Sequence, residues 1–158
     1  MEHPKDIGDR SALAIMYVLR SLGHEVLVPF GENTRYDLAI DDGARLARVQ
    51  CKTGRLRDGC IVFKTSSAYA HHPNPRVTKR DYHGEVEFFA VFCPETGGVY
   101  LIPIEDLPTH CEARLRIEPT RNSQKRRIRH AAQYEIARLP VAARAELAAR
   151  AGGSGSCA

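Results

Sequence analysis

At 158 residues the chain is long enough for one domain with a single buried core, and its formal net charge of +4 is too modest to define a partner by itself. A composition of 43% hydrophobic and 27% charged residues is ordinary for a soluble globular protein, and no apolar run approaches the ~20 residues of a membrane-spanning helix. Five cysteines without a Cys-x-x-Cys pair argue against a disulfide framework, so we expect reduced thiols and, because no apolar leader opens the chain, a cytoplasmic protein.

The first predicted element is a helix over residues 8–22. Apolar residues recur at helical spacing across this segment, and Gly23 is suited to end it. Asp9 lies near the predicted start, where the simplest interpretation is an N-cap that accepts exposed backbone N–H groups. A strand over residues 25–29 follows the helix.

The next segment, residues 35–52, reads RYDLAIDDGARLARVQCK and predicts a β-hairpin. Its Asp-Asp-Gly sequence is a strong turn signal between two apolar runs. Side chains on a strand alternate between the two faces of a sheet. We therefore expect Gln50 and Lys52 on one face, and Val49 and Cys51 on the other.

The hairpin also brings together polar side chains that are suited to phosphodiester chemistry. Asp37 lies 13 residues before Gln50, which leaves room for the turn to fold it back beside Gln50 and Lys52. A carboxylate, an amide oxygen and an ammonium would then meet at one end of the hairpin and could hold a metal ion and a water molecule. The alternative is an exposed cross-strand ion pair between Asp37 and Lys52 that contributes little energy.

Further strands are predicted from apolar runs at 60–65, 87–93 and 99–103. A polar and basic loop is expected over residues 53–59, and a short helical turn at 104–107. The cysteines at 51, 60 and 93 are expected as small buried apolar residues. A cysteine–histidine nucleophile stays open as an alternative, although the sequence supplies no orienting context for one.

Residues 66–82 show no clean periodicity and are expected to form a long functional loop with a helical turn near Ser67. Tyr69, His71 and Tyr82 in this loop are candidates for stacking on bases or for contacting phosphates.

Positive charge is concentrated in residues 114–129. This segment contains seven Lys or Arg residues and a single acid, Glu118, which gives it a net charge of +6. Such a segment fits a polyanion that is bound through phosphate contacts and counterion release. The alternative is a solvated charged face. The candidate nucleic-acid contacts within it are Asn122, Gln124, Lys125, Arg126 and Arg127.

The succession of the first helix, the strand after it and the two hairpin strands resembles the core of the PD-(D/E)xK nuclease superfamily. The segment PFGENTRYDLAIDDGARLARVQCKTGRLRDG resembles more narrowly the branch associated with group I introns, which includes homing endonucleases. The resemblance covers residues 5–136 and is most specific between residues 29 and 59. It implies an α/β fold with a restriction-endonuclease-like core, that is, a central mixed β-sheet flanked by helices.

This fold is expected to occupy residues 1–139 as one endonuclease-like domain. Residues 140–158 are expected to form a C-terminal helix and a flexible tail, because an Ala-rich segment there is followed by Gly and Ser.

The resemblance also assigns roles to the hairpin residues. In that branch glutamine commonly replaces the acid in the second half of the motif, so Asp37, Gln50 and Lys52 fall on the active-site positions. Asp37 and Gln50, with the backbone carbonyl of Cys51, would hold Mg²⁺ or Mn²⁺, and Lys52 would position the attacking water.

One position departs from the family pattern. The superfamily often supplies a further acid from its first helix, and Ala12 stands at that position in this sequence. Asp9 lies three residues earlier, about one helical turn away, and is the candidate that would reach the same space.

We therefore predict a Mg²⁺-dependent DNA endonuclease of the homing type. Hydrolysis would leave a 5′-phosphate and a 3′-hydroxyl, as the resemblance implies. DNA is the expected partner, with Arg35, Arg55 and Arg57 as candidate phosphate clamps around the site. A homo-oligomer, dimer or tetramer, is expected because cutting both strands needs two active sites. The alternative function is a catalytically impaired nucleic-acid-binding module that retains the nuclease fold.

Overall fold

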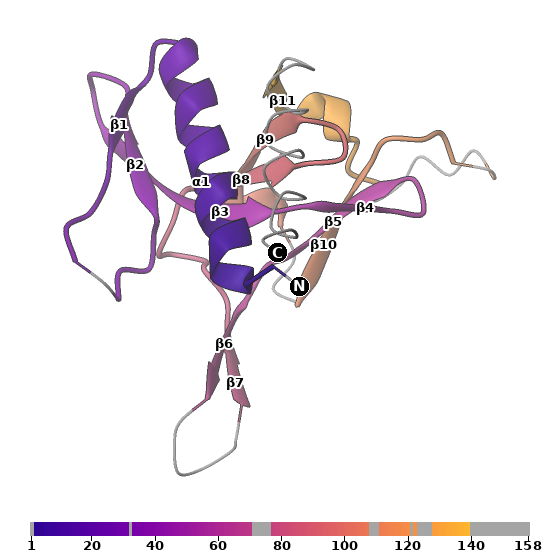
Figure 1. Ribbon diagram of the computed structural model, residues 1–158, viewed down its shortest axis with the longest axis horizontal. Coiled ribbons are helices and arrows are strands. Elements are labelled where there is room, and N and C mark those ends of the chain that lie inside the picture. The colour runs from indigo at the N-terminus through magenta and orange to yellow at the C-terminus, as the bar shows by residue number, and fades with distance from the viewer. Residues whose placement is uncertain are drawn as a thin grey trace, which may run out of the picture.

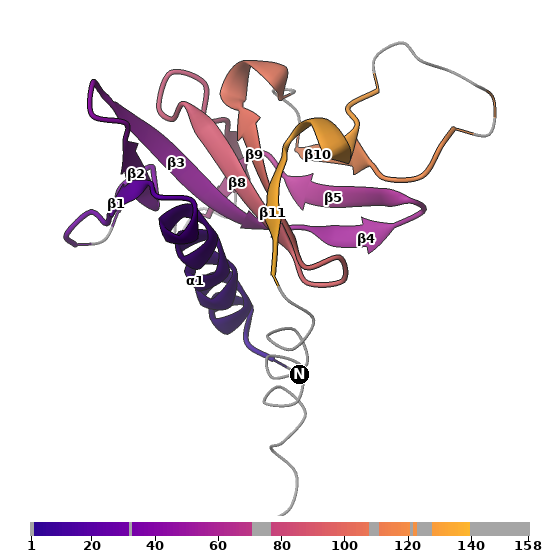
Figure 2. The same cartoon turned by 90° about the horizontal axis from the view of Figure 1, so that it is seen from above.

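The computed structural model describes residues 2–31, 33–70, 77–107, 111–120, 122 and 128–139. Within these residues a six-stranded mixed sheet carries one α-helix on one face and a three-stranded sheet on the other (Figure 1 and Figure 2). The α/β class and the central mixed sheet are therefore confirmed. Among the described residues, however, the second face is covered by strands and not by a further α-helix. No helix among the described residues is long and apolar enough to cross a membrane.

The six-stranded sheet has the strand order β1-β2-β3-β8-β9-β11, in which β3 and β8 are parallel and the other pairs are antiparallel. Its strands are β1 (Glu25–Leu27), β2 (Leu38–Asp41), β3 (Leu46–Thr53), β8 (Phe88–Cys93), β9 (Gly98–Pro103) and β11 (Glu135–Arg138). Two short 3-10 helices, η1 (Ile104–Asp106) and η2 (Ala131–Gln133), lie in the connections that follow β9 and precede β11.

The three-stranded sheet has the order β10-β5-β4 and is antiparallel. Its strands are β4 (Arg55–Arg57), β5 (Cys60–Lys64) and β10 (Glu112–Arg116). A separate hairpin of β6 (Ser67–Ala70) and β7 (Val77–Arg80) projects away from the rest of the domain (Figure 1).

The helix α1 (Pro4–Ser21) begins earlier than the sequence pattern predicts. Pro4 occupies a first-turn position that tolerates a missing N–H, and the His3 side chain accepts a hydrogen bond from the Lys5 backbone N–H at 3.2 Å. Asp9 therefore lies inside the helix, and the interpretation of Asp9 as its N-cap is wrong.

Strand β8 explains why the core has two halves. Ala90 and Phe92 point toward α1 and pack with the apolar stripe of that helix. Phe89 and Val91 point the other way and pack with β5 and β10. A strand that is buried on both faces reads as a continuous apolar run, which is why its sequence predicts it well.

Two segments that were expected as loops contain strands, and so does the basic stretch, for which no element was predicted. The stretch 53–59 holds β4, which turns into β5 through Asp58 and Gly59, with φ angles of +48° and +71°. These left-handed conformations make the two-residue hairpin turn that an Asp-Gly pair favours. In the basic stretch, β10 buries Ala113 and Leu115 while its charged residues alternate outward.

The long loop and helical turn expected over 66–82 are also wrong, because β6 and β7 pair from Ser67 with Arg80 to Ala70 with Val77. The apolar alternation from which a strand is predicted is missing in this segment. The 104–107 turn is confirmed as η1, whereas the helix and tail expected beyond residue 139 lie outside the described residues.

Candidate active site

The β2–β3 hairpin sets the positions of Asp37, Gln50, Cys51 and Lys52 in the candidate site. Its register pairs Leu38 with Val49, and the Asp37 backbone N–H donates to the Val49 carbonyl at 2.9 Å. Asp37 is thereby held at the start of β2, across from Gln50. A shift of one residue would turn every β3 side chain to the opposite face, so the turn that fixes the register also fixes the site.

The turn itself is held by its two aspartates. The Asp41 carboxylate accepts from the Gly43 backbone N–H at 2.8 Å, and the Asp42 carboxylate accepts from the N–H groups of Ala44 and Arg45. Gly43 has a φ of +86°, which other residues rarely adopt. The Asp-Asp-Gly signal therefore acts through side-chain bonds to the backbone as well as through the glycine.

The Asp37 carboxylate has two hydrogen bonds, both to its Oδ2 atom. Gln50 Nε2 donates to it at 2.7 Å, and the Cys51 backbone N–H donates to it at 2.8 Å. Within the described part of the chain, neither Asp37 Oδ1 nor Gln50 Oε1 takes part in a hydrogen bond. Two oxygen atoms therefore stay open to a further ligand.

Burial raises the pKa of Asp37 above the ordinary aspartate value. The Cys51 N–H, the charge of Lys52 and the Gln50 amide each lower this pKa, in that order, without cancelling the desolvation. Asp37 is accessible to solvent from one side, but many protein atoms lie close to its carboxylate and partly desolvate it. Both observations fit a carboxylate in an open pocket. A bound cation would favour the charged form that the protein alone disfavours.

Lys52 is held near Asp37 by aromatic rings and not by a direct ion pair. Its Nζ atom lies 4.9 Å from the ring centroid of Tyr82 and 5.6 Å from that of Phe89. It acts on the Asp37 carboxylate through space. Val49 is fully buried on the opposite, helix-facing side, where Cys51 also packs. The structure thus places Gln50, Cys51 and Lys52 as the strand alternation predicts, and it shows no direct ion pair between Asp37 and Lys52, which was the alternative interpretation.

A pocket of about 430 Å³ lies between α1 and the start of β2. Asp9 and Ala12 line it from the helix, and Asp37 and Cys51 line it from the sheet. Asp9 and Ala12, the position where the resemblance places a further acid, thus line the same pocket. The helix is joined to β3 by a 2.5 Å hydrogen bond between the Ser11 and Thr53 hydroxyls.

Known proteins share both the sequence pattern and the fold of this chain. The model of the PD-(D/E)XK endonuclease family matches residues 2–137. The chain belongs to this family. It is also similar to the solved structure of a bacterial homing endonuclease, I-Ssp6803I, with a TM-score of 0.69 and 21% sequence identity over 98% of this chain and 100% of that one. A comparison with curated proteins finds no match.

The donor atoms in this PD-(D/E)XK endonuclease suit a hard divalent cation. The candidate ligands are Asp37 Oδ1, the Asp9 carboxylate, Gln50 Oε1 and the Cys51 carbonyl, all of them oxygen atoms. The Cys51 N–H points to Asp37, and since the N–H and C=O of one strand residue point to the same side, its carbonyl lies on this edge as well. Among the described residues no three His, Cys, Asp or Glu side chains cluster as a metal site. An amide, a backbone carbonyl and retained waters would have to complete the coordination of Mg²⁺.

The Cys51 thiol is a poor nucleophile in this position. Burial and the neighbouring Asp37 raise the pKa of this thiol well above its ordinary value, so it stays protonated. A thiol that is not ionised is neither a nucleophile nor a metal ligand. The cysteine–histidine alternative therefore finds no support at Cys51.

The three arginines predicted as phosphate clamps differ in their surroundings. Arg35 donates to Glu85, to the Ser67 hydroxyl and to the Asp81 carbonyl, so each of its guanidinium nitrogens is engaged. It therefore acts as a scaffold that joins the β6–β7 hairpin to the following loop. Arg55 approaches Glu95 at 3.8 Å, and Arg57 is exposed without a partner among the described residues.

The other predicted nucleic-acid contacts are less defined. Asn122 is exposed. Tyr69 lies in β6, but its side chain is outside the described residues, as are His71 and the residues at 124–127. Their contacts with nucleic acid stay predictions.

Sequence reasoning missed the aromatic support of Lys52. Tyr82 is only 5% exposed and contacts both Lys52 and Arg35, so it is not available to stack on a base. Phe89 belongs to the core and carries no local signal for this role. The sequence analysis also left out Lys64 as a candidate phosphate contact. Strand alternation could have predicted its exposure, because it follows the buried Phe63 at the end of β5.

Proposed function

We propose that this protein is a Mg²⁺-dependent DNA endonuclease that cuts at specific sites, as a homing-type enzyme does. The observation that carries the proposal is the Asp37 carboxylate, which presents one oxygen to Gln50 and Cys51 and the other to open space, with Lys52 held beside it. This arrangement and the family of the chain support phosphodiester hydrolysis in place of an unspecific binding role.

The residues of the chain have separate tasks in this proposal. Asp37, Gln50 and the Cys51 carbonyl would hold the divalent ion, with Asp9 reaching in from α1. When bound, that ion supplies a polarised phosphate and a more acidic water. The Gln50 amide and the Cys51 N–H orient the Asp37 carboxylate. The Lys52 ammonium holds the attacking water and stabilises the negative charge that develops on the phosphate oxygens.

Supercoiled plasmid DNA incubated with Mg²⁺, with Mn²⁺ or with EDTA tests the proposal. The wild-type protein is expected to nick or linearise the plasmid with either metal and to leave it intact in EDTA. Lys52→Ala is expected to abolish cleavage while DNA binding in EDTA is retained. Cleavage that survives Lys52→Ala would count strongly against the assignment. Mapping of the ends would show whether cuts fall at one sequence.

Double-strand cleavage needs two active sites, so we further propose that the protein acts as a homo-oligomer, a dimer or a tetramer. Light scattering of the protein with and without a DNA duplex tests this directly. A monomer that linearises the plasmid in single binding events would contradict it.

A second candidate function is a nucleic-acid-binding module that has lost most of its activity. Ala12, at the position where the family places an acid, favours it, because the pocket then has fewer carboxylates to hold the ion. Binding of DNA without metal-dependent cleavage would support this alternative.

A further inference from the structure

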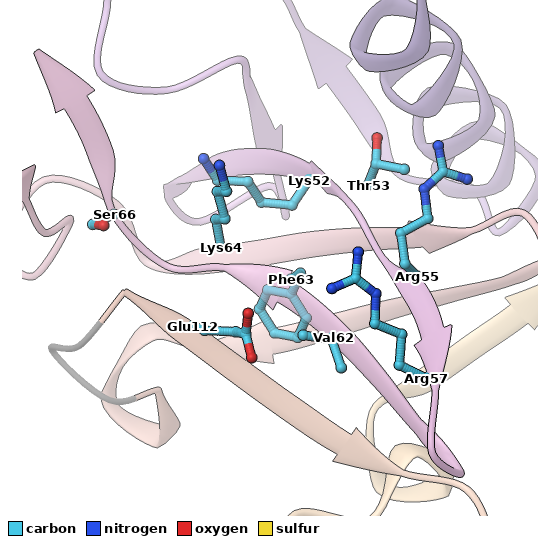
Figure 3. A pocket seen from close by; sticks show the side chains of 9 residues that line it. All are labelled: Lys52, Thr53, Arg55, Arg57, Val62, Phe63, Lys64, Ser66 and Glu112. Atoms are coloured by element: carbon cyan, nitrogen blue, oxygen red, sulfur yellow. The ribbon is translucent and has the colours of Figure 1, made fainter. Parts of the chain in front are cut away.

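A second pocket, of about 330 Å³, lies on the other side of β3 from the carboxylates (Figure 3). Cys51 lines the carboxylate pocket and the next residue, Lys52, lines this one. The principal charged groups around it are Lys52, Arg55, Arg57, Lys64 and Glu112. One strand thus separates a space that holds Asp9 and Asp37, together with Lys5, from a space whose charged groups are mainly cations.

The register of the three-stranded sheet explains why these cations share one face. Arg55 pairs with Val62, and Lys64 pairs with Glu112 across the adjacent ladder. Residues paired in this way, and residues two apart on a strand, project from the same face. The opposite face carries Ile61 and Leu115, which are fully buried in the core. The sheet is therefore apolar inward and basic outward.

The protein itself neutralises only part of this charge. Glu112 is paired with Arg114 at 3.2 Å, and Arg55 approaches Glu95 at 3.8 Å. Arg57 and Lys64 are exposed, and neither has an acidic partner among the residues that the structure describes. Figure 3 shows the Lys64 and Lys52 side chains reaching the same end of the pocket, while Arg57 points into it. Neighbouring like charges repel, so an anionic occupant would stabilise this face.

The chemistry of the pocket favours a phosphate group over a base. Arginine and lysine donors match phosphate oxygens, whereas the described residues that line the pocket offer no exposed ring on which a base could stack. Phe63 is the aromatic residue that lines it, and it is only 3% exposed. Thr53, Val62 and Ser66 are the other small residues at its wall.

We propose that this pocket binds the DNA backbone phosphate adjacent to the scissile one, through Arg57 and Lys64. Lys52, which lines this pocket and acts through space on the Asp37 carboxylate, would act on the scissile phosphate. The inference rests on the proposed nuclease function. If the pocket binds this phosphate, the cleaved DNA strand must run from the carboxylate pocket, across β3, to the outer face of β4 and β5.

DNA binding in EDTA tests the pocket without relying on cleavage. The probe is a fluorescein-labelled duplex of mixed sequence, titrated by fluorescence anisotropy at several salt concentrations. Arg57→Ala/Lys64→Ala is expected to weaken binding and to reduce the slope of log Kd against log salt by about 2, one for each positive charge that no longer neutralises a phosphate. Arg57→Lys/Lys64→Arg, which keeps both charges, is expected to retain most of the slope.

The matched control is Arg20→Ala/Arg45→Ala, which removes two exposed positive charges outside this pocket. A loss of affinity and slope in Arg57→Ala/Lys64→Ala that exceeds that of the control supports the pocket. Equal effects in the two double variants, or an unchanged slope, would overturn it even if the wild type cleaves DNA with Mg²⁺. Conversely, a wild type that binds through this pocket but never cleaves would contradict the proposed function and leave the pocket standing.

Discussion

Gln50 donates its amide N–H to the same Asp37 oxygen that accepts the Cys51 backbone N–H, at 2.7 and 2.8 Å. A carboxylate at position 50 would instead repel Asp37. The amide thus orients the Asp37 carboxylate, and its own oxygen stays available as a neutral ligand. In the proposed function, Gln50 would replace an acid because it combines a donor toward Asp37 with an oxygen that could accept a metal ion.

The raised pKa of Asp37 predicts a pH-dependent gain in stability on substitution by asparagine. The folded-state pKa lies above the unfolded-state pKa, so folding favours the protonated form. The wild type is therefore expected to lose stability relative to Asp37→Asn as pH rises from about 4 through the folded-state pKa, and to differ by a constant amount above it. The midpoints of urea unfolding of the wild type and of Asp37→Asn, measured in EDTA across this pH range, test this prediction. A difference that shrinks as pH rises would contradict the sign.

Asp9 is expected to set the metal requirement. Asp9→Asn should raise the Mg²⁺ concentration for half-maximal cleavage by at least about tenfold, since loss of even an outer-shell group costs that much. Adding Ala12→Asp to the Asp9→Asn variant should return this Mg²⁺ concentration toward the wild-type value, because position 12 lines the same pocket. Cleavage rates over a Mg²⁺ titration provide the measurement. An unchanged Mg²⁺ dependence in Asp9→Asn would remove Asp9 from the site.

The aromatic wall beneath Lys52 is expected to contribute to the rate. A cation over a tyrosine ring is worth ~0.5–2 kcal/mol, so Tyr82→Leu should lower the single-turnover cleavage rate about 2- to 30-fold. Tyr82→Phe keeps the ring and should retain most of the rate. DNA affinity in EDTA should be the same in both variants. Equal rates in the leucine and phenylalanine variants would show that the ring does not position Lys52.

Gly54 is expected to tolerate no larger side chain. A Cβ at this position would lie 2.5 Å from Ile61 Cγ2 and 2.9 Å from Val91 Cγ1. Gly54→Ala should therefore destabilise the fold by about 1–3 kcal/mol through overpacking. Gly8→Ala is the control, because a Cβ there meets nothing within 4 Å and should stabilise α1. Urea unfolding of the two variants decides the matter, and a neutral Gly54→Ala would contradict the packing.

The parts of the site that could be predicted from the sequence are those formed within one hairpin. Asp37, Gln50 and Cys51 are joined by a turn and by strand alternation, both of which are local. The contacts of Lys52 with Tyr82 and Phe89 join distant segments, and no local pattern encodes them. Strand β4 could have been found from its Asp-Gly turn, and β10 from its alternation. The β6–β7 hairpin had no comparable apolar signal.

Only one residue, Gly54, separates β3 from β4, and its backbone N–H donates to the Phe92 carbonyl at 2.8 Å. A longer connection would let the two sheets open independently, so we expect this short junction to make them unfold as one cooperative unit. Amide hydrogens of Lys52 and Arg55 should then exchange with solvent through the same opening event. In the proposed function, the cations of β4 and β5 that bind DNA and the catalytic Lys52 would then lose their positions together. A partly unfolded protein would therefore lose DNA binding and cleavage at the same time.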